Sequence, residues 1–338
     1  MRKYKIGIAV LLFAIVLMGC GEKSQEDVRS KLEETAQDLQ AYQAEAKMTL
    51  KTGQDDQVYH VNIAHKKEDL YRVLLKNEND EESSQIILKN EDGVFVLTPA
   101  LNKSFKFQSD WPENNSQPYL YQSLIKDVVD DSEATFTSTE NYYVFRTKTN
   151  YKSNTNLPYQ ELYFDKKSLT PILVKVLDKD DEALVEVEFQ QFEIDPDLPK
   201  DTFLMDNNMS SSLLGIPAMA EGETQQDFSI LYPTEKLGAE LVEMDEHETD
   251  HGKRVMLSYE GEKNFTIIEE TIDVMETSGA MTEVPNGEPV NLGFTTGAQT
   301  ESSLKWSYNG VNYYLASEEL TKEEMISVAG SISAQSIK

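Results

Sequence analysis

The chain has 338 residues, and its 60 Asp and Glu outnumber 31 Lys and Arg, which gives a formal net charge of −29. Such an acidic surface repels phosphate groups, which argues against nucleic acid as a partner. The hydrophobic content of 39% is enough for packed cores. The length predicts roughly two domains.

The N-terminus carries the features of an export signal. Three basic residues precede the apolar run Ile6 to Met18, and Gly19-Cys20 follows it. A basic start, a short apolar run and a small residue before a cleavage point are typical of a secretory signal peptide. The run of 13 residues is short, because a membrane-spanning helix needs roughly 20 apolar residues. We therefore predict a signal peptide over residues 1–19.

Cys20 is the only cysteine, so it has no disulfide partner within the chain. Its position resembles that of the lipidated cysteine in a bacterial lipobox, where Ala or Ser usually stands in the place of Met18. The resemblance implies that the Cys20 thiol takes diacylglycerol and that residues 20–26 form a lipidated tether. The protein is then expected at the extracytoplasmic face of the cell membrane. An ordinary cleaved signal peptide is the alternative.

Hydrophobic periodicity predicts one helix followed by many strands. Asp27 through Tyr42 has apolar residues at spacings of three, four and seven, which indicates an amphipathic helix. From Ala44 to Phe192 the pattern has a period of two, interrupted by one helical segment near Pro118 to Val129. A large antiparallel sheet of short strands tends to curl. The expected fold class is mainly β (α+β), a half-open antiparallel β-barrel with helices plugging its concave face.

A change of composition indicates a second domain. Asn207 to Gln226 is rich in Ser and small residues, and strand periodicity resumes after it. Asn309-Gly310 marks a hairpin, and Thr321 begins a final helix with a capping-box order. We expect a half-barrel domain at residues 27–206, a linker at 207–227 and a small C-terminal α+β domain at 228–338.

Three segments resemble a known superfamily in their order and spacing. They are the Asp-Gly turn and strand of Glu91 to Pro99, the strand, Asp-Lys turn and Pro of Leu162 to Pro171, and the closing segment Phe192 to Phe203. Together they are similar to the LolA, LolB and RseB-like lipoprotein-carrier superfamily over about residues 25–206. The resemblance implies a half-open barrel whose apolar concavity accepts acyl chains or an apolar segment of a partner. With the lipobox and the C-terminal segment, the chain resembles Firmicute sporulation lipoproteins, which implies a role in sporulation or envelope maintenance.

If the concavity binds an apolar ligand, one alternate set of side chains on each strand must face inward. The wholly apolar sets are the natural choice, because their alternates carry charges or amides. The predicted ligand-binding residues are Tyr71, Val73 and Leu75 on one strand and Val185, Val187 and Phe189 on another. The alternative is that both sets pack under the helices.

One enzyme motif occurs literally in the sequence. His247-Glu248-Thr249-Asp250-His251 satisfies the H-E-x-x-H spacing that places two zinc-binding imidazoles on one helical face. The surrounding residues are almost wholly polar and Gly252 follows at once, which favours a solvated hairpin tip. We therefore predict no metal site, no cofactor and no catalytic residues, with a zinc hydrolase as the remote alternative.

Two kinds of function remain open. The half-barrel is expected to bind a lipid, an acyl chain or a lipoprotein, or else to dock an envelope protein as a scaffold or sensor, for example an envelope enzyme or an anti-sigma-type regulator. Both uses need an apolar concavity. A true shuttle has to leave the membrane, and a lipid-anchored protein does not, so the sequence favours sensing or scaffolding over transport.

Overall fold

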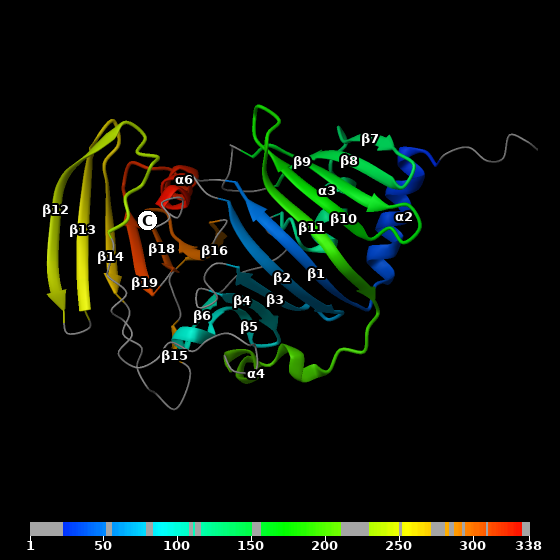
Figure 1. Cartoon of the computed structure of the whole chain (residues 1–338), viewed down its shortest axis with the longest axis horizontal. Helices are drawn as coiled ribbons and strands as arrows, with labels where there is room; N and C mark the ends of the chain where they lie inside the picture. The colour runs from blue at the N-terminus through cyan, green and yellow to red at the C-terminus, as the bar shows by residue number, and fades with distance from the viewer. Residues whose placement is uncertain are drawn as a thin grey trace, which may run out of the picture.

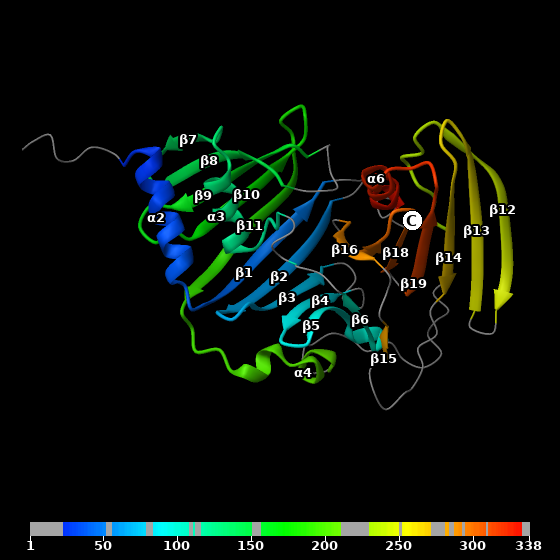
Figure 2. The same cartoon turned by 180° about the vertical axis from the view of Figure 1, so that it is seen from behind.

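The computed structural model describes residues 23–51, 56–78, 84–107, 111, 116–150, 157–210, 230–249, 252–271, 281–283, 287–292, 295–308 and 310–332. The predicted signal peptide, Cys20 and residues 211–227 of the predicted linker lie outside these ranges. The molecule is elongated and contains two β-sheets, with helix α2 at one end and the C-terminal sheet at the other (Figure 1). The reverse view shows the same order of elements (Figure 2).

The larger sheet confirms the expected half-open barrel of antiparallel strands. Its order is β15-β6-β5-β4-β3-β2-β1-β11-β10-β9-β8-β7, and the two end strands do not pair with each other. Strand β1 pairs with both β2 and β11, so the first and last strands of the N-terminal region meet at the centre of the sheet. The strands are β1 (Ala41–Leu50), β2 (Gln57–Lys66), β3 (Leu70–Asn77), β4 (Gln85–Asn90), β5 (Gly93–Thr98), β6 (Lys103–Phe107), β7 (Thr135–Ser138), β8 (Tyr142–Lys148), β9 (Tyr159–Asp165), β10 (Pro171–Leu177) and β11 (Ala183–Ile194), with the short β15 (Met281–Glu283) at one edge.

The hairpins use the residues that such turns require. Gly93 begins β5 with a φ of +135°, a backbone conformation that side-chain-bearing residues rarely adopt. Between β9 and β10, the Asp165 carboxylate accepts hydrogen bonds from the backbone N–H groups of Lys167 and Ser168, at 2.8 and 2.9 Å. These local bonds hold the turn and therefore the register of the strands on either side.

Helix α2 (Gln25–Asp38) begins at a capping box formed by Ser24 and Asp27. The prediction that this helix continues to Tyr42 is wrong, because β1 begins at Ala41. The Tyr42 ring is fully buried and stacks on Phe192 of the neighbouring strand, with ring centroids 5.2 Å apart. The inward-facing alternation of β1 therefore starts at Tyr42 and outweighs the helical spacing that precedes it.

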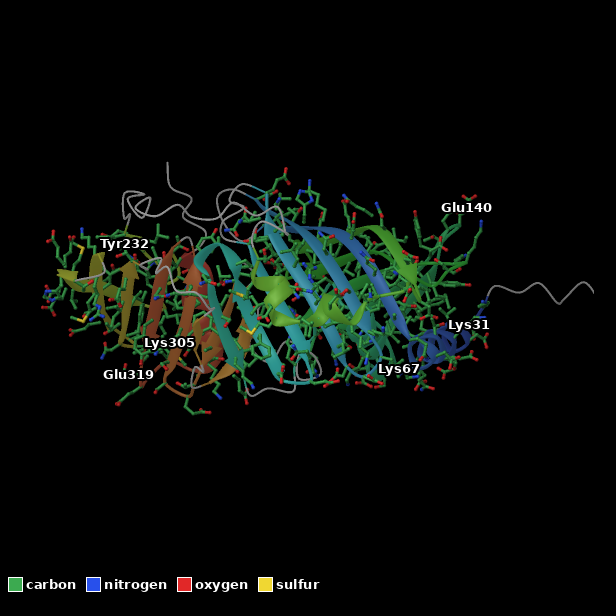
Figure 3. All side chains as sticks on the ribbon, turned by 90° about the horizontal axis from the view of Figure 1, so that it is seen from below. Lys31, Lys67, Glu140, Tyr232, Lys305 and Glu319 are labelled. Atoms are coloured by element: carbon green, nitrogen blue, oxygen red, sulfur yellow. The ribbon has the colours of Figure 1, made fainter. Side chains whose placement is uncertain are left out.

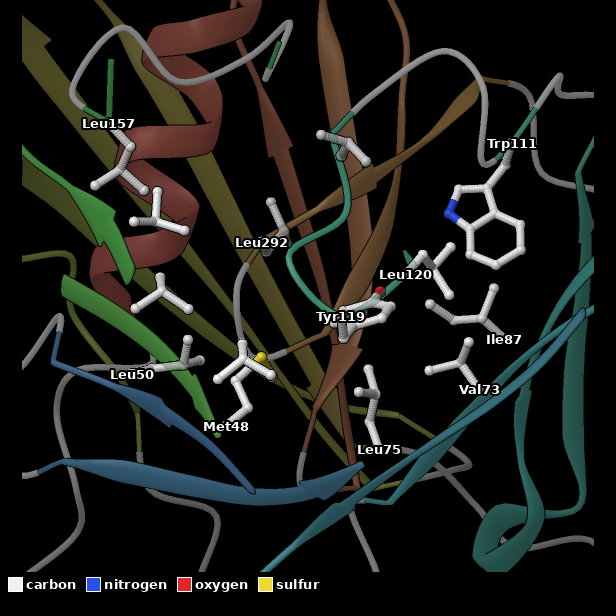
Figure 4. Close-up of a cluster of buried hydrophobic side chains, with 14 of the residues drawn as sticks. Met48, Leu50, Val73, Leu75, Ile87, Trp111, Tyr119, Leu120, Leu157 and Leu292 are labelled. Carbon is white, nitrogen blue, oxygen red and sulfur yellow. The ribbon is translucent and has the colours of Figure 1, made fainter. Parts of the chain in front are cut away.

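The concave face of the larger sheet is filled by packed side chains. Helix α3 (Tyr121–Asp130) confirms the helix predicted within the strand run. Figure 4 shows Leu120 and Trp111 beside Val73 and Ile87, which belong to β3 and β4. All four side chains are at most 5% exposed and belong to one buried cluster that also includes residues of α2. The helices and their connecting segments thus plug the half-barrel, as the sequence predicts.

The outer face of β3, β4 and β5 is covered by the segment that leaves β11. The 3₁₀ turns are η2 (Pro99–Leu101) and η3 (Lys200–Phe203), and α4 (Met205–Met209) follows the second. Phe203 packs with a second buried cluster on this face. The Arg72 side chain donates a hydrogen bond of 2.6 Å from Nε to Asn208 Oδ1. The start of the predicted linker is therefore packed against the barrel through Asn208.

The C-terminal sheet has the order β12-β13-β14-β19-β18-β17-β16, and all its pairs are antiparallel. Helix α6 (Lys322–Ile332) begins at the predicted capping box, in which the Thr321 N–H donates to Glu324 Oε2 at 2.9 Å. Among the described residues, no helix is both long and apolar enough to cross a membrane. The strands are β12 (Ala239–Thr249), β13 (Gly252–Gly261), β14 (Phe265–Thr271), β16 (Glu288–Asn291), β17 (Thr296–Gln299), β18 (Ser303–Tyr308) and β19 (Val311–Ala316).

The two sheets are joined directly. Strand β15 comes from the C-terminal region and pairs in parallel with β6 of the larger sheet, Met281 lying opposite Lys103. The Thr296 N–H donates a hydrogen bond of 3.3 Å to Gln85 Oε1 of β4. The sheets therefore meet at the edge of the half-barrel formed by β4, β5 and β6.

Candidate functional site

A cavity of about 520 Å³ lies between the two sheets. Its volume is within the range of small-ligand and peptide side-chain sites. Its wall combines apolar and aromatic side chains with polar and charged ones, and both sheets contribute. The described lining residues are Gln85, Val96, Phe105, Phe107, Arg254, Ile268, Glu270, Thr296, Ala298, Lys305, Trp306, Ser307, Asn312, Tyr313 and Tyr314.

One wall of the cavity continues the concave face of the half-barrel. Leu75 of β3 lies opposite Gln85 of β4, and Val96 of β5 lies opposite Phe105 of β6. Directly opposed residues of paired strands share one face of the sheet. Because Val96 and Leu75 belong to one apolar cluster and Phe105 packs against it, the cavity lies at the β6 end of the predicted concavity.

The facing wall comes from two rows of side chains that cross the C-terminal sheet. Ile268, Tyr314 and Lys305 lie opposite one another on β14, β19 and β18. Glu270, Asn312 and Ser307 form the neighbouring row on the same three strands. The period of two along each strand places both rows on the cavity side.

The charged groups of this wall are only partly balanced. Arg254 Nη2 lies 2.8 Å from Glu270 Oε1, so this pair is locally neutral. Ser307 Oγ donates a hydrogen bond of 2.6 Å to Asn312 Oδ1. The Lys305 ammonium lies over the Tyr314 ring, 5.2 Å from its centroid. The cavity therefore offers aromatic surface together with both donors and acceptors.

The six residues predicted to bind a ligand lie on the concave face but do not line this cavity. Val73 and Val187 are fully buried, and Tyr71 is 5% exposed with its ring edge-to-face against Trp111 at 5.6 Å. Phe189 is partly buried against the same cluster. Their role in ligand binding stays a prediction, and their surroundings are those of packed interior side chains.

The C-terminal lining residues were not identified from the sequence. A signal was nevertheless present, because Ile267-Ile268 and Tyr313-Tyr314 place large apolar side chains on both faces of their strands. A strand that is apolar on both faces is usually covered on both. Ile267 and Tyr313 are buried in the C-terminal core, while Ile268 and Tyr314 face the half-barrel.

The H-E-x-x-H stretch lies at the end of strand β12, which continues through Thr249. In the register of β12 with β13, His247 lies opposite Arg254 and Glu248 lies opposite Lys253. Successive side chains of a strand point to opposite faces, so this backbone does not provide the helical face of a zinc metalloprotease. Asp250 and His251 lie outside the described residues. Within the described ranges, no group of three or more His, Cys, Asp or Glu side chains is placed to hold a metal ion.

A buried carboxyl group lies on the opposite face of the C-terminal sheet from the cavity. Glu269 is fully buried on β14, and its Oε2 accepts a hydrogen bond of 3.1 Å from the Leu231 N–H. Its Oε1 has no hydrogen-bond partner among the residues that the structure describes. Burial disfavours the ionised form and raises the pKa of Glu269 from 4.5 to about 7.

We expect Glu269→Gln to stabilise the protein at alkaline pH. Below about pH 4.5 the carboxyl group is protonated in both the folded and the unfolded chain, and its stabilising contribution is complete. As the pH rises to about 7 and beyond, the unfolded chain loses the proton first, so stability falls by about 3 kcal/mol. Urea unfolding at pH 5 and pH 8 should show the variant gaining mainly at pH 8. An equal gain at both values would contradict the ionisation of a buried Glu269.

Comparisons with known proteins place this architecture in a family. Residues 2–203 match the family model described as sporulation protein YdcC-like. The chain belongs to this family. The sporulation protein YdcC of Bacillus subtilis (strain 168) is 48% identical over 338 residues, which is 100% of this chain and 98% of the relative. This confirms the family resemblance predicted from the sequence, and this YdcC-like chain is a homologue of a sporulation protein.

Solved structures show weaker similarity to the YdcC-like chain. The MucA/MucB complex of Pseudomonas aeruginosa contains a chain with a TM-score of 0.35 and 14% identity, covering 89% of this chain and 96% of its own. The LolA superfamily protein NE2245 from Nitrosomonas europaea has a TM-score of 0.31 and 12% identity, with coverage of 55% and 99%.

Proposed function

We propose that this YdcC-like protein is a membrane-anchored, extracytoplasmic binding protein that docks an apolar segment of an envelope protein in the cavity between its two sheets. The observation that carries the proposal is the cavity itself, because it combines a ready-made apolar wall with polar groups that can orient a ligand. The half-barrel interior beside it is filled with packed side chains. This geometry supports binding as the activity of the cavity.

The polar part of the wall favours a peptide over a bare acyl chain. An alkyl chain offers no hydrogen bonds to Gln85, Asn312 or Ser307 and leaves the Arg254–Glu270 pair without new partners. Leaving such groups unpaired on desolvation costs free energy. A peptide segment supplies both an apolar side chain and backbone donors and acceptors.

The position of the predicted anchor also favours a partner in the aqueous extracytoplasmic space over one within the membrane. Cys20 lies five residues before Gln25, the first residue of α2, so an anchored chain can hold the start of α2 at most about 17 Å from the anchor. Figure 3 places Lys31 of α2 at the end of the molecule opposite Lys305, which lines the cavity. With α2 next to the bilayer, the cavity stands away from the membrane and faces the extracytoplasmic space.

Photo-crosslinking in spore-forming cells tests this proposal. Benzoylphenylalanine in place of Phe105 puts the reactive group in the cavity wall, and the same amino acid in place of Tyr142 puts it on the exposed face of β8. We expect a discrete peptide adduct from position 105 and none from position 142. Adding Ile268→Trp should fill the cavity and remove the adduct.

Two results would contradict the proposal. A phospholipid adduct as the sole product at position 105 would show that the cavity takes lipid. Equal peptide adducts at positions 105 and 142, unchanged by Ile268→Trp, would show contact without cavity binding.

A further inference from the structure

Strand β12 is a long edge strand with no neighbour on its outer side in the described part of the chain. It has 11 residues, whereas the other sheet edges, β16, β7 and β15, have four, four and three. Its pairing with β13 shifts register between Leu241 and Glu243 and is regular from there to Thr249. In the described part of the chain, residues 243–248 of this edge present a regular row of outward backbone N–H and C=O groups that can template another strand.

The same strand exposes large apolar side chains. Leu241, Val242 and Met244 are 37%, 55% and 47% exposed. Leu241 and Met244 lie opposite Tyr259 and Leu257, which are buried, so they extend the apolar face of the C-terminal core out to the edge. Soluble proteins protect a long edge with charged side chains, Pro or bulges; β12 has acidic side chains and one register shift but no Lys or Pro, so it repels an acidic strand and leaves a cationic one free to approach.

The charge of β12 has one sign. Between Ala239 and Thr249 the strand has five acidic residues and no Lys or Arg. Lys253 pairs with Glu246 at 2.5 Å, and Lys236 approaches Glu240 at 3.4 Å. Glu243, Asp245 and Glu248 have no Lys or Arg partner in the described part of the chain.

We propose that β12 is a second docking site, independent of the cavity, that adds a strand of a cationic partner in which Lys or Arg alternates with apolar residues. Backbone pairing supplies the affinity, and the acidic side chains select the partner's charge. A second copy of this chain is a poor occupant, because β12 against β12 sets carboxylates opposite carboxylates, and like charges directly opposite one another destabilise a strand pair.

Three synthetic peptides and the full chain test the proposal. The first alternates Lys and Val, the second has one central Val replaced by Pro, and the third has Glu in place of every Lys. We expect binding of the first peptide only, measured by fluorescence anisotropy, with affinity that falls as salt is added. Amide hydrogen exchange should show new protection confined to residues 240–249. The Pro peptide has the same charge but lacks one backbone N–H. If it bound as tightly as the first peptide, the binding would be non-specific electrostatic attraction, and strand addition would be disproved.

Substitutions in the chain provide the second arm. Val242→Lys with Met244→Lys should weaken binding of the Lys-Val peptide by about tenfold or more, since both positions are exposed and the added charges oppose the ligand. Tyr142→Lys on β8 is the matched control, with similar exposure on the other sheet, and should change little. Unchanged melting of the double variant shows that the loss is local. Self-association of the wild-type chain that disappears in the double variant would show instead that a second copy occupies β12, and would overturn the proposal.

Discussion

Val73→Asn is expected to destabilise the protein by about 3 to 5 kcal/mol. Val73 is fully buried on β3, where Ile63 and Ile87 lie opposite it on the two neighbouring strands. Leu120 lies on the same side of the sheet (Figure 4). An amide at this position would be buried without hydrogen-bond partners, and the apolar contacts of two methyl groups would be lost. Urea unfolding followed by far-ultraviolet circular dichroism measures the change.

Val242→Asn is the matched control for that experiment, because Val242 has the same side chain but is 55% exposed on β12. Its cost should lie within about 0.5 kcal/mol, as for most surface substitutions. If Val73→Asn were as mild as Val242→Asn and reduced ligand recovery, Val73 would line a solvated pocket. In that case the packed interior inferred for the half-barrel would be wrong.

Much of the fold can be predicted from two local patterns, the alternation of apolar side chains along strands and the residues at turns. The period of two in β3 and β11 predicts both the strands and their inward faces, and Asp165 and Gly93 mark the turns that join neighbours in the sheet. The helix boundary was missed at Tyr42 because its apolar spacing fits both a helix and a strand. Stacking on Phe192, 150 residues further along the sequence, decides between them.

The candidate site was less predictable for a physical reason. The sequence indicates which face of a strand is apolar, but the cavity depends on where the second sheet meets the first. The two sheets are held together by contacts such as the hydrogen bond from the Thr296 N–H to Gln85 Oε1, and by the pairing of three residues of β15 with β6. These segments carry no strong strand signal of their own. The cavity is lined by residues of β4 to β6 and not by the predicted residues of β3 and β11, whose role in ligand binding stays a prediction.

If Cys20 takes a lipid, as the sequence predicts, the anchor sets how the proposed site is presented to a partner. In that case α2 would lie beside the membrane and the cavity would lie farther from it, whereas a chain without the anchor would diffuse freely. Two acyl chains hold a protein stably on a bilayer, whereas a single chain binds only marginally and reversibly. We therefore expect the lipidated protein to be found wholly in the membrane fraction and the unlipidated protein wholly in the soluble fraction.

Cys20→Ser is expected to abolish labelling by palmitate and to move the protein from the membrane fraction to the soluble fraction. Serine has no thiol to take the diacylglycerol, and Cys20 is the only cysteine, so no other position can replace it. Met18→Ala is the matched control, because it brings the segment closer to the usual lipobox and should retain both label and membrane recovery. Equal label and equal membrane recovery in the Cys20→Ser variant would disprove the anchor. Nothing would then hold α2 beside the membrane, while the cavity and the β12 edge would keep the same geometry.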